Sequence, residues 1–376
     1  MKMKSLLLLA SLLMCTATDA QQKYHTQNII YISIDGYRWK ELFRGAEHAL
    51  LVSKKYNSTD TTDNLKHYWS DDIKERRKLL MPFTWDVIEK HGQLYGNRDL
   101  DNNVNVRNKA WISYPGRAES LTGYADPAIT TNSYPDNPND NVLEFLNNQK
   151  GFKGKVVTFA SWDVVGRIVN RNRNGMLVNI PFENLQGNNL SEAEKLANET
   201  QHYAPKIWGD DERLDANTYA IARSYIFAHH PRVVYLDLAD TDDYGHDGKY
   251  DAYLQAIHNI DKMIGHLWQG LQQDDFYKNK TTFIIVPDHG RGDDHQWTSH
   301  GSSIPHANDT WLLVFGPDTP PLGEMKGPQQ LYQDQFAKTL AAFLGFNFTS
   351  KQHPVGQEVT TVFMNPQQAQ STATSK

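Results

Sequence analysis

Short apolar runs alternate with amphipathic runs along most of the chain. Apolar, β-branched runs typical of buried strands occur at 28–34, 155–159, 232–238, 281–286 and 311–315. Apolar residues at helical spacing occur at 82–90, 141–148, 216–228, 250–271 and 330–344. This alternation predicts an α/β fold in which a mostly parallel central sheet carries helices on both faces.

Two polar stretches interrupt this pattern. Residues 44–80 are rich in charged and aromatic side chains, and residues 163–215 contain an Asn- and Arg-rich segment and a Gly-Asn-Asn turn. We interpret both as insertions that cap the active edge of one domain spanning 21–376, although solvated surface loops would have the same composition. Residues 367–376 are rich in Gln, Ser and Thr, which predicts disorder.

Residues 1–20 have the pattern of a secretory signal peptide. Lys2 and Lys4 precede an apolar run at 6–14 that is too short to span a bilayer, and small residues follow it. The pattern predicts export to the periplasm or the medium, and no later segment is long and apolar enough to be transmembrane. Cys15, the only cysteine of the chain, is expected to leave with this segment. Lipid attachment to it is a less favoured alternative, because the residue before it fits that signal poorly.

The composition suits a large folded domain. Hydrophobic residues make up 39% of the 376 residues, enough for a sizeable core. The net charge is −6 and no basic stripe is visible, which argues against duplex nucleic acid as a partner.

Metal-binding side chains follow several of the predicted strands. They are Asp35 after the first strand, Asp242 and His246 after the third, Asp288 and His289 after the fourth, and His300 before the fifth. A polar turn residue explains any one of them, but not a whole set of metal ligands. Ligands of such folds gather beyond the carboxyl ends of the strands, so we expect these side chains to share one site. Imidazole and carboxylate together favour zinc, with manganese as an alternative.

Ser113 is the candidate nucleophile. Pro115 favours the first turn of a helix, which would place Ser113 at a helix start whose positive end favours an alkoxide and an incoming phosphate. A bound metal would lower the pKa of the hydroxyl. Arg117 lies four residues on and could grip two substrate oxyanions. The alternatives are a capping serine and a surface ion pair.

Other histidines and aromatics compete for roles. His306 is the main rival of His300, while His295, His229 and His230 are interpreted as surface or structural residues. The aromatic candidates for stacking on a substrate, or alternatively for packing, are Trp162, Tyr203 and Trp208.

This set of segments resembles the alkaline phosphatase superfamily, and most closely its branch of type I phosphodiesterases and nucleotide pyrophosphatases. The resemblance runs from Ile34 to Pro317. It implies that one zinc is bound by Asp35, Ser113, Asp288 and His289. It implies that a second zinc is bound by Asp242, His246 and His300. The implied activity is hydrolysis of a small-molecule or glycan phosphoester through a phosphoserine intermediate.

Two departures from the family pattern matter. Serine stands where the diesterases usually have threonine, and Gly116 replaces an asparagine that helps to hold the phosphoryl group. The choice between monoester and diester is therefore left open.

The segment Ser113-x-Pro-x-Arg117 also resembles the maturation signature of sulfatases, in which the serine becomes a formylglycine. A sulfatase with one calcium ion is thus the alternative, although the first strand here ends in a single aspartate and the second metal trio is intact. A phosphate monoester carries about two negative charges and suits two dications better than a sulfate ester does. A metal-containing binding protein that has lost catalysis is a minor alternative.

Overall fold

The computed structural model describes residues 24–363, and within them the chain forms a central sheet of eight strands in the order β10-β2-β9-β7-β1-β6-β4-β5. The strands are β1 (Asn28–Ile34), β2 (Gly92–Tyr95), β4 (Val156–Ala160), β5 (Leu177–Asn179), β6 (Val233–Leu238), β7 (Thr281–Pro287), β9 (Leu312–Phe315) and β10 (Gly323–Glu324). From β7 to β5 all neighbours are parallel, and β9 runs antiparallel to both β7 and β2. The predicted α/β architecture with a mostly parallel sheet is confirmed.

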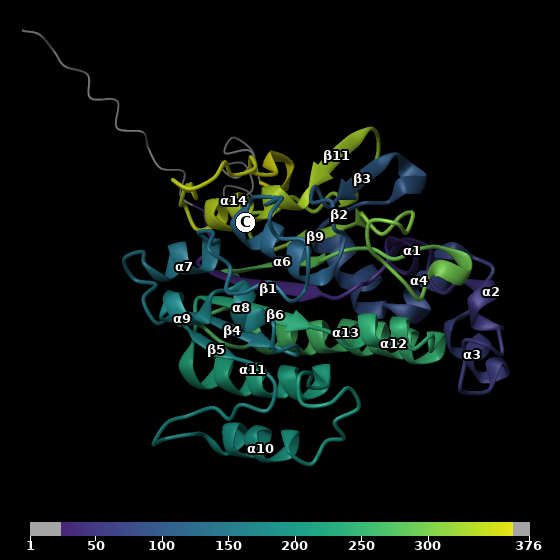
Figure 1. The fold of residues 1–376 in the computed structure, drawn as a ribbon, viewed down its shortest axis with the longest axis horizontal. Coiled ribbons are helices and arrows are strands. Elements are labelled where there is room, and N and C mark those ends of the chain that lie inside the picture. The colour runs from purple at the N-terminus through teal and green to yellow at the C-terminus, as the bar shows by residue number, and fades with distance from the viewer. Residues whose placement is uncertain (1–23, 364–376) are drawn as a thin grey trace, which may run out of the picture.

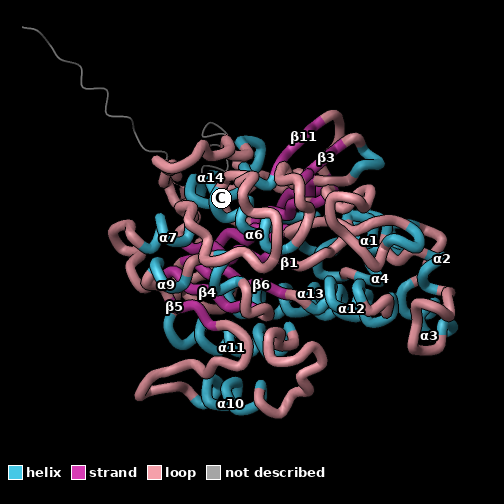
Figure 2. The backbone as a smooth tube through the Cα atoms, in the orientation of Figure 1, coloured by secondary structure: helices cyan, strands magenta, loops and turns pink. Residues whose placement is uncertain are grey.

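Helices cover both faces of the sheet. The side chains of β1 point alternately to the two faces, and each face needs a layer of helices to bury its apolar side chains. Ile30, Ile32 and Ile34 belong to one core, and Ile29 and Tyr31 to the other. In Figures 1 and 2 the strands run through the middle of the molecule with helices on either side. One layer contains α6 (Ser113–Thr122), α7 (Val142–Asn147), α8 (Val165–Ile168) and α14 (Phe336–Phe343). The other contains α11 (Asp215–His229), α13 (Tyr250–Leu271) and the first helices of the chain, α1 (Trp39–Arg44) to α4 (Ile73–Leu80).

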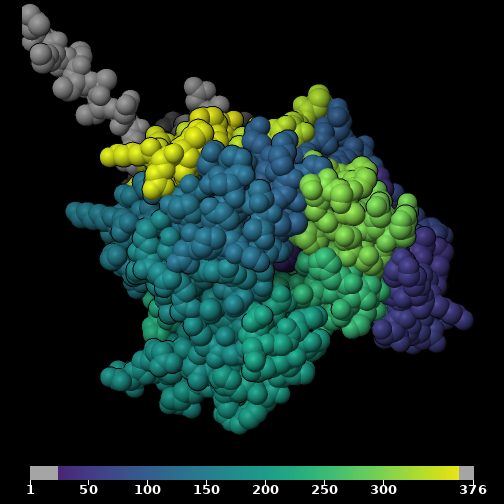
Figure 3. All heavy atoms as spheres, in the orientation of Figure 1, coloured from purple at the N-terminus to yellow at the C-terminus, as the bar shows by residue number. Residues whose placement is uncertain are grey.

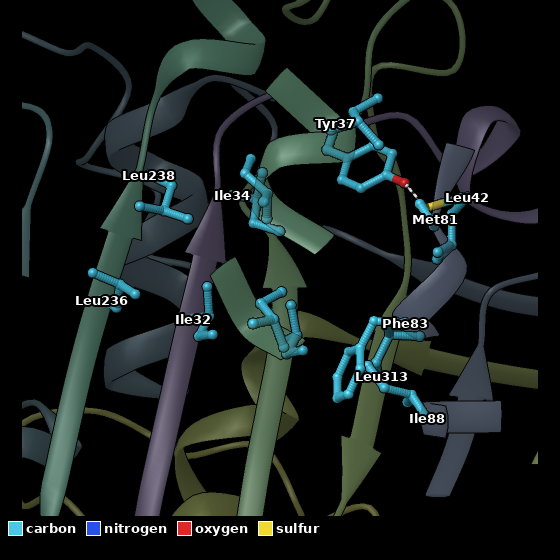
Figure 4. Packing of buried hydrophobic residues seen from close by; sticks show 14 of the residues in the cluster. Ile32, Ile34, Tyr37, Leu42, Met81, Phe83, Ile88, Leu236, Leu238 and Leu313 are labelled. Atoms are coloured by element: carbon cyan, nitrogen blue, oxygen red, sulfur yellow. Dashed lines mark hydrogen bonds between the residues drawn. The ribbon is translucent and has the colours of Figure 1, made fainter. Parts of the chain in front are cut away.

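The core beside the carboxyl ends of the strands is packed by side chains from several elements. Figure 4 shows Ile34 and Leu238 on the neighbouring strands β1 and β6, and Leu313 on β9, with Tyr37 beyond the end of β1 bonded through its hydroxyl to Met81. Burial of such side chains is worth roughly 1.5–3 kcal/mol each. The segment that leaves β1 after Ile34 therefore begins from a rigidly packed point.

Two predicted helices differ from the structure. Residues 330–344 were expected to be helical throughout, but their first part forms β11 (Gln329–Tyr332), which pairs with β3 (Asn102–Asn105) in a second sheet with β8 (Asp309–Thr310). Only Leu331 of β11 is buried, as befits an edge strand, and the helix α14 starts at Phe336. The helix predicted at 82–90 contains a π-helical turn at Thr84–Ile88 before α5 (Glu89–His91).

The two polar stretches fold into helices on the outside of the sheet layers. The first contains α2 (His48–Leu51), α3 (Thr61–Tyr68) and α4, which pack near α13. The second contains α9 (Arg171–Asn174), β5 and α10 (Glu192–Gln201), and α10 lies against α11 in the lower lobe of Figure 3. From α10 the chain returns to the edge of the sheet beyond the end of β6, where the ring centroid of Trp208 lies 5.0 Å from that of Tyr244.

The predicted signal peptide at 1–20 with Cys15, and the predicted disordered segment 367–376, lie outside the described residues. Among the helices of residues 24–363, none has an apolar stretch long enough to cross a membrane.

Candidate metal centre and nucleophile

The ends of three neighbouring parallel strands bring the predicted metal ligands together. Asp35 directly follows β1, Asp242 lies in the short helix α12 (Asp240–His246) after β6, and Asp288 directly follows β7. Because β6, β1 and β7 are adjacent in the sheet, the three carboxylates meet at one edge. His300 reaches the same edge from the loop after β7.

The first group of ligands surrounds the hydroxyl of Ser113. Asp35 Oδ1 lies 3.1 Å from His289 Nε2. Ser113 Oγ lies 3.2 Å from the same nitrogen and 3.4 Å from Asp35 Oδ1. Donor atoms of Asp35, Asp288 and His289 all lie within 4.8 Å of one another. The candidate nucleophile is thus in contact with a buried carboxylate and imidazole.

The second group lies beside the first and shares His289 with it. Asp242 Oδ2 lies 3.0 Å from His246 Nε2 and 3.6 Å from His300 Nε2. These two imidazole nitrogens are 2.9 Å apart, and the rings of His289 and His300 stack with centroids 3.9 Å apart. Donor atoms of Asp242, His289 and His300 also lie within 4.8 Å of one another.

The hydrogen bonds of the histidines leave the right nitrogens free for a cation. Nδ1 of His289 donates to the carbonyl of Gly290 at 2.8 Å, and Nδ1 of His300 donates to that of Trp111 at 3.2 Å. Both Nε2 atoms are then unprotonated and face the carboxylates, which is the arrangement that a metal ligand requires. Burial lowers the pKa of His300, and neighbouring His289 lowers it further, so its imidazole is kept neutral. The donor set fits divalent cations that accept nitrogen and oxygen ligands.

The other histidines lie outside this cluster. Nδ1 of His306 donates to Asp309 at 3.0 Å, and its side chain is half exposed, so His300 and not His306 joins the ligands. His229 and His230 contact carboxylates of Glu194 and Asp274 on the surface. His295 is exposed in a short turn.

Comparison with known proteins agrees with this arrangement. Residues 211–307, which include the ligands from Asp242 to His300, match a family model described as the Metalloenzyme superfamily. The 2,3-bisphosphoglycerate-independent phosphoglycerate mutase of Trichodesmium erythraeum (strain IMS101) is 29% identical over 111 residues, 27% of this chain. That match spans about a fifth (19%) of the length of the mutase.

Solved structures match over a larger share of the chain. Alkaline phosphatase PafA aligns with a TM-score of 0.57 and 11% identity over 90% of this chain and 99% of its own. A murine ectonucleotide pyrophosphatase/phosphodiesterase, in an inactive form in complex with AMP, aligns with a TM-score of 0.54 and 12% identity over 90% of this chain and 100% of its own. The chain has the fold of the alkaline phosphatase superfamily.

Arg117 lies behind the carboxylates of this candidate site. Nε donates to Asp237 at 2.7 Å, Nη2 lies 2.9 Å from Asp35 Oδ2, and Nη1 bonds to Asp288. The side chain has no exposed surface. This differs from the expected contact with a substrate oxygen, because all three nitrogens already serve carboxylates. Arg117 instead positions the ligands, and although burial opposes ionisation, it holds the pKa of Asp35 below its usual value.

A second buried arginine, which sequence reasoning missed, supports Asp242. Nη1 of Arg291 bonds to Asp242 Oδ1, and Nε donates to the carbonyl of Trp297 at 2.7 Å. Oδ2 of Asp242 is thereby left to face the imidazoles. A Cβ atom on Gly245 would lie 2.7 Å from the guanidinium carbon, so this position needs glycine. Although burial opposes it, Arg291 holds the pKa of Asp242 well below its usual range.

The buried charges of the site do not cancel. The four aspartates at 35, 237, 242 and 288 share two arginines, so with all four ionised they would have two negative charges in excess. Burial, together with the neighbouring carboxylates of Asp35 and Asp242, raises the pKa of Asp288 well above its usual value. Buried charges are costly unless paired, which favours cations at this position. The sequence does not mark Asp237 as a site residue, because a single carboxylate inside the apolar strand β6 does not interrupt the strand pattern.

Ser113, the candidate nucleophile, is the first residue of α6, and Gly116 in the same turn lies close to the backbone of Asp288. A Cβ atom on Gly116 would lie 2.2 Å from the carbonyl oxygen of Asp288. Glycine is therefore required where the family pattern has asparagine. No side chain at this position can hold a substrate oxygen, so the missing contact must come from another segment or be absent.

Glu119 of α6 holds the loop that precedes Ser113. Its carboxylate accepts hydrogen bonds from the backbone N–H groups of Arg107 and Asn108, each at 2.8 Å. The side chain of Asn108 in turn accepts from the N–H of Trp111 at 3.0 Å. Trp111 has a φ of 53°, rare for a bulky residue, and its carbonyl fixes His300. Figure 3 shows the light-green surface around residue 300 beside the blue surface of this segment.

Replacing Glu119 with Gln should change how stability depends on pH. Burial raises the pKa of Glu119 to about 7 from its ordinary value of 4.5, and the charge of Asp334 adds to the rise. Between these two pH values, the folded protein therefore binds one proton more than the unfolded protein at this group. The contribution of this group to stability falls as pH rises through that window and is constant above it.

We expect the wild type to gain unfolding free energy relative to Glu119→Gln when the pH is lowered from about 8 to about 5.5. Urea unfolding of both proteins at both pH values measures this change. Glu192→Gln, at a 90% exposed side chain, is the control and should show no such change. A Glu119→Gln difference that is the same at both pH values would contradict the prediction.

Proposed function

We propose that the chain is a two-metal phosphoester hydrolase that acts through a phosphoserine intermediate at Ser113. The observation that carries the proposal is the contact of Ser113 Oγ with His289 and Asp35, at the point where two ligand groups share His289. One cation would be held by Asp35, Asp288, His289 and Ser113. The other would be held by Asp242, His246 and His300. Zinc fits the mixed nitrogen and oxygen donors, with manganese as the alternative.

Cations at these two positions would lower the pKa of the Ser113 hydroxyl and neutralise charge on the substrate oxygens. The chain's own residues supply the geometry. Asp35 and Asp242 each give one oxygen to a buried arginine and the other to the site. Ser113 is the first residue of α6, so the positive end of this helix would favour an anionic group bound beside the serine oxygen.

Charge balance favours a phosphate ester over a sulfate ester. With all four aspartates ionised and the Ser113 hydroxyl protonated, the buried cluster would have two uncompensated negative charges, and two dications would then give it a net charge of two positives. A phosphate monoester, at about −2, would neutralise that charge, and a sulfate ester would leave part of it. A sulfatase in which Ser113 is converted to formylglycine stays the second candidate, since Ser113-x-Pro-x-Arg117 is present and one calcium alone would balance the cluster.

A substrate panel tests the proposal. The purified protein is assayed with an aryl phosphate, a bis-aryl phosphate and an aryl sulfate, before and after chelation and after return of zinc, manganese or calcium. We expect phosphoester turnover that chelation abolishes and zinc restores, with two metal ions bound per chain. Turnover of the sulfate alone, with one calcium and an aldehyde mass on the Ser113 peptide, would replace the proposal with the sulfatase. Bound metal without turnover of any ester would favour a binding protein.

We further propose, from the signal-peptide pattern of residues 1–20, that the enzyme acts outside the cytoplasm on a small-molecule or glycan ester. We also propose that residues 44–80 and 163–215 form caps over the edge of the sheet that carries the site. The return of the second stretch to the active edge at Trp208 supports it.

A further inference from the structure

A buried carboxylate of α6 holds the backbone segment that leads to the candidate nucleophile. Glu119 has no exposed surface, and its oxygens accept from the N–H of Arg107 at 2.8 Å and from the N–H and Nδ2 of Asn108 at 2.8 and 2.9 Å. An ionised carboxylate only accepts hydrogen bonds, so one side chain satisfies all three donors. Because Glu119 and Ser113 belong to the same helix, the segment is fixed to the element that carries the nucleophile.

The same segment then bends sharply at Trp111. Oδ1 of the buried Asn108 accepts from the N–H groups of Ala110 and Trp111 at 3.1 and 3.0 Å. Trp111 has a φ of 53°, a left-handed conformation that a bulky residue keeps only where the surrounding structure imposes it. Asn108 therefore forms the bend with its side-chain oxygen and joins Glu119 with its side-chain nitrogen. We call Glu119 and Asn108 together the latch.

At this bend the carbonyl of Trp111 meets His300, whose Nδ1 donates to it at 3.2 Å. Within residues 24–363, no other hydrogen bond or ion pair joins the His300 side chain to a group outside the two ligand groups. A Cβ atom on Gly301 would lie 3.7 Å from the side chain of Ile112, so the backbone after His300 also rests on this segment. The position of His300 therefore depends on the segment that the latch holds.

We propose that Glu119 and Asn108 are positioning residues which, through the carbonyl of Trp111, hold His300 at a fixed place relative to Ser113 and so set the affinity of the second ligand group for its cation. This inference rests on the two-metal function proposed above. Outer partners that orient a ligating histidine change metal affinity by about 10–100-fold when they are lost. The first ligand group has its own support in Arg117, so the effect should be confined to the second.

Zinc titration of the purified, metal-stripped chain against a chromophoric chelator tests the inference. The pH is 8, above the pKa of about 7 to which burial raises Glu119, so that the carboxylate is ionised. His246→Ala identifies the binding phase that belongs to the second group, because His246 contacts Asp242. Glu119→Gln places an amide donor against backbone N–H groups, and Asn108→Ala removes the acceptor that forms the bend. Two different latch variants keep the test valid if one of them folds poorly.

We expect both latch variants to weaken zinc binding at the second group by about 10-fold or more and to leave the first group within about threefold of the wild type. Trp111→Gly keeps the carbonyl and adopts a positive φ without strain, so it should stay within about threefold at both groups. Glu194→Gln is the matched control, because Glu194 is also buried and accepts from the N–H of Ser191 at 2.8 Å, but lies in α10. It should lower the melting temperature and leave both affinities unchanged.

The contrary results separate this inference from the function on which it rests. If the latch variants lose stability but bind both zinc ions as tightly as the wild type, the latch only supports the fold, and the inference is wrong although two metals bind. Equal losses at both groups, or a similar loss in Glu194→Gln, would also overturn it, because they would show a general loosening. If Trp111→Gly loses as much as the latch variants, the indole and not the carbonyl holds His300, and the inference is again wrong. A wild type that binds only one zinc ion would instead overturn the two-metal function, and this inference with it.

Discussion

Replacing Ser113 with alanine is expected to lower turnover of an aryl phosphate by about three orders of magnitude or more, because the variant has no oxygen to receive the phosphoryl group. Such a loss corresponds to about 4 kcal/mol of transition-state stabilisation. The measurement is kcat under saturating substrate, together with acid-quenched single-turnover experiments. Labelled phosphate should be trapped on the wild-type chain and not on Ser113→Ala.

Two further variants give this prediction its controls. Ser120→Ala removes another buried serine of α6, whose hydroxyl donates to the carbonyl of Arg117 at 2.9 Å and does not face the ligands. It should stay within about tenfold of the wild type. Ser113→Thr keeps a hydroxyl, so it should retain measurable phosphoester turnover.

The threonine variant also separates the two candidate chemistries. A formylglycine forms only by oxidation of a primary alcohol or thiol to an aldehyde, and threonine carries a secondary alcohol. Ser113→Thr should therefore be inactive if the enzyme is a sulfatase. Ser113→Ala that keeps more than a tenth of wild-type turnover would show that Ser113 is not the nucleophile in either case.

The sheet could be predicted because its strands have patterns that do not depend on distant contacts. A strand buried on both faces is mostly apolar, and residues 28–34 and 281–286 are apolar except for Asn28, Ser33 and the first two threonines of the second stretch. Residues 330–335 could not be assigned correctly, because an edge strand with one buried leucine and a helix start have the same mixture of Gln, Leu and Tyr. There the pairing with β3 decides the conformation.

The residues that gather as candidate metal ligands could be predicted from the sequence, but the residues that support them could not. Asp35 and Asp288 follow recognisable strands and carry ligand chemistry themselves. The sequence predicts a charged group at Arg117 that contacts substrate, but only the folded structure shows that its guanidinium turns inward to three carboxylates. Arg291 is no metal ligand, so nothing in its spacing marked it.

Replacing Arg291 with methionine should make the stability of the protein far more dependent on bound metal. In the absence of metal, the change leaves Asp242 as a buried carboxylate without its guanidinium partner. Breaking a buried ion pair in this way costs about 3–5 kcal/mol. A cation bound at Asp242, His246 and His300 would compensate the same charge, so the loss should be much smaller when zinc is present.

The test compares urea unfolding of wild type and Arg291→Met with chelator and with excess zinc. Arg77→Met is the matched control, because Arg77 forms a largely buried pair with Glu324 at 3.0 Å, with no contact to the site. It should lose stability equally in both conditions. The zinc-dependent gain in unfolding free energy should be larger in Arg291→Met than in wild type, as ligand binding to the folded state alone requires.

The expected difference between the two conditions depends on whether Asp242 has Arg291, a metal cation or neither as its partner. Arg291 and a cation contact different oxygens of the same carboxylate, so each reduces the charge that the other must neutralise. Removal of the arginine therefore weakens the metal-free protein and raises the benefit of metal binding, even if the carboxylate is held less rigidly. An equal loss for Arg291→Met with and without zinc would mean that no cation binds at Asp242. The assignment of the second metal group would then be wrong, while the group around Ser113 would be unaffected.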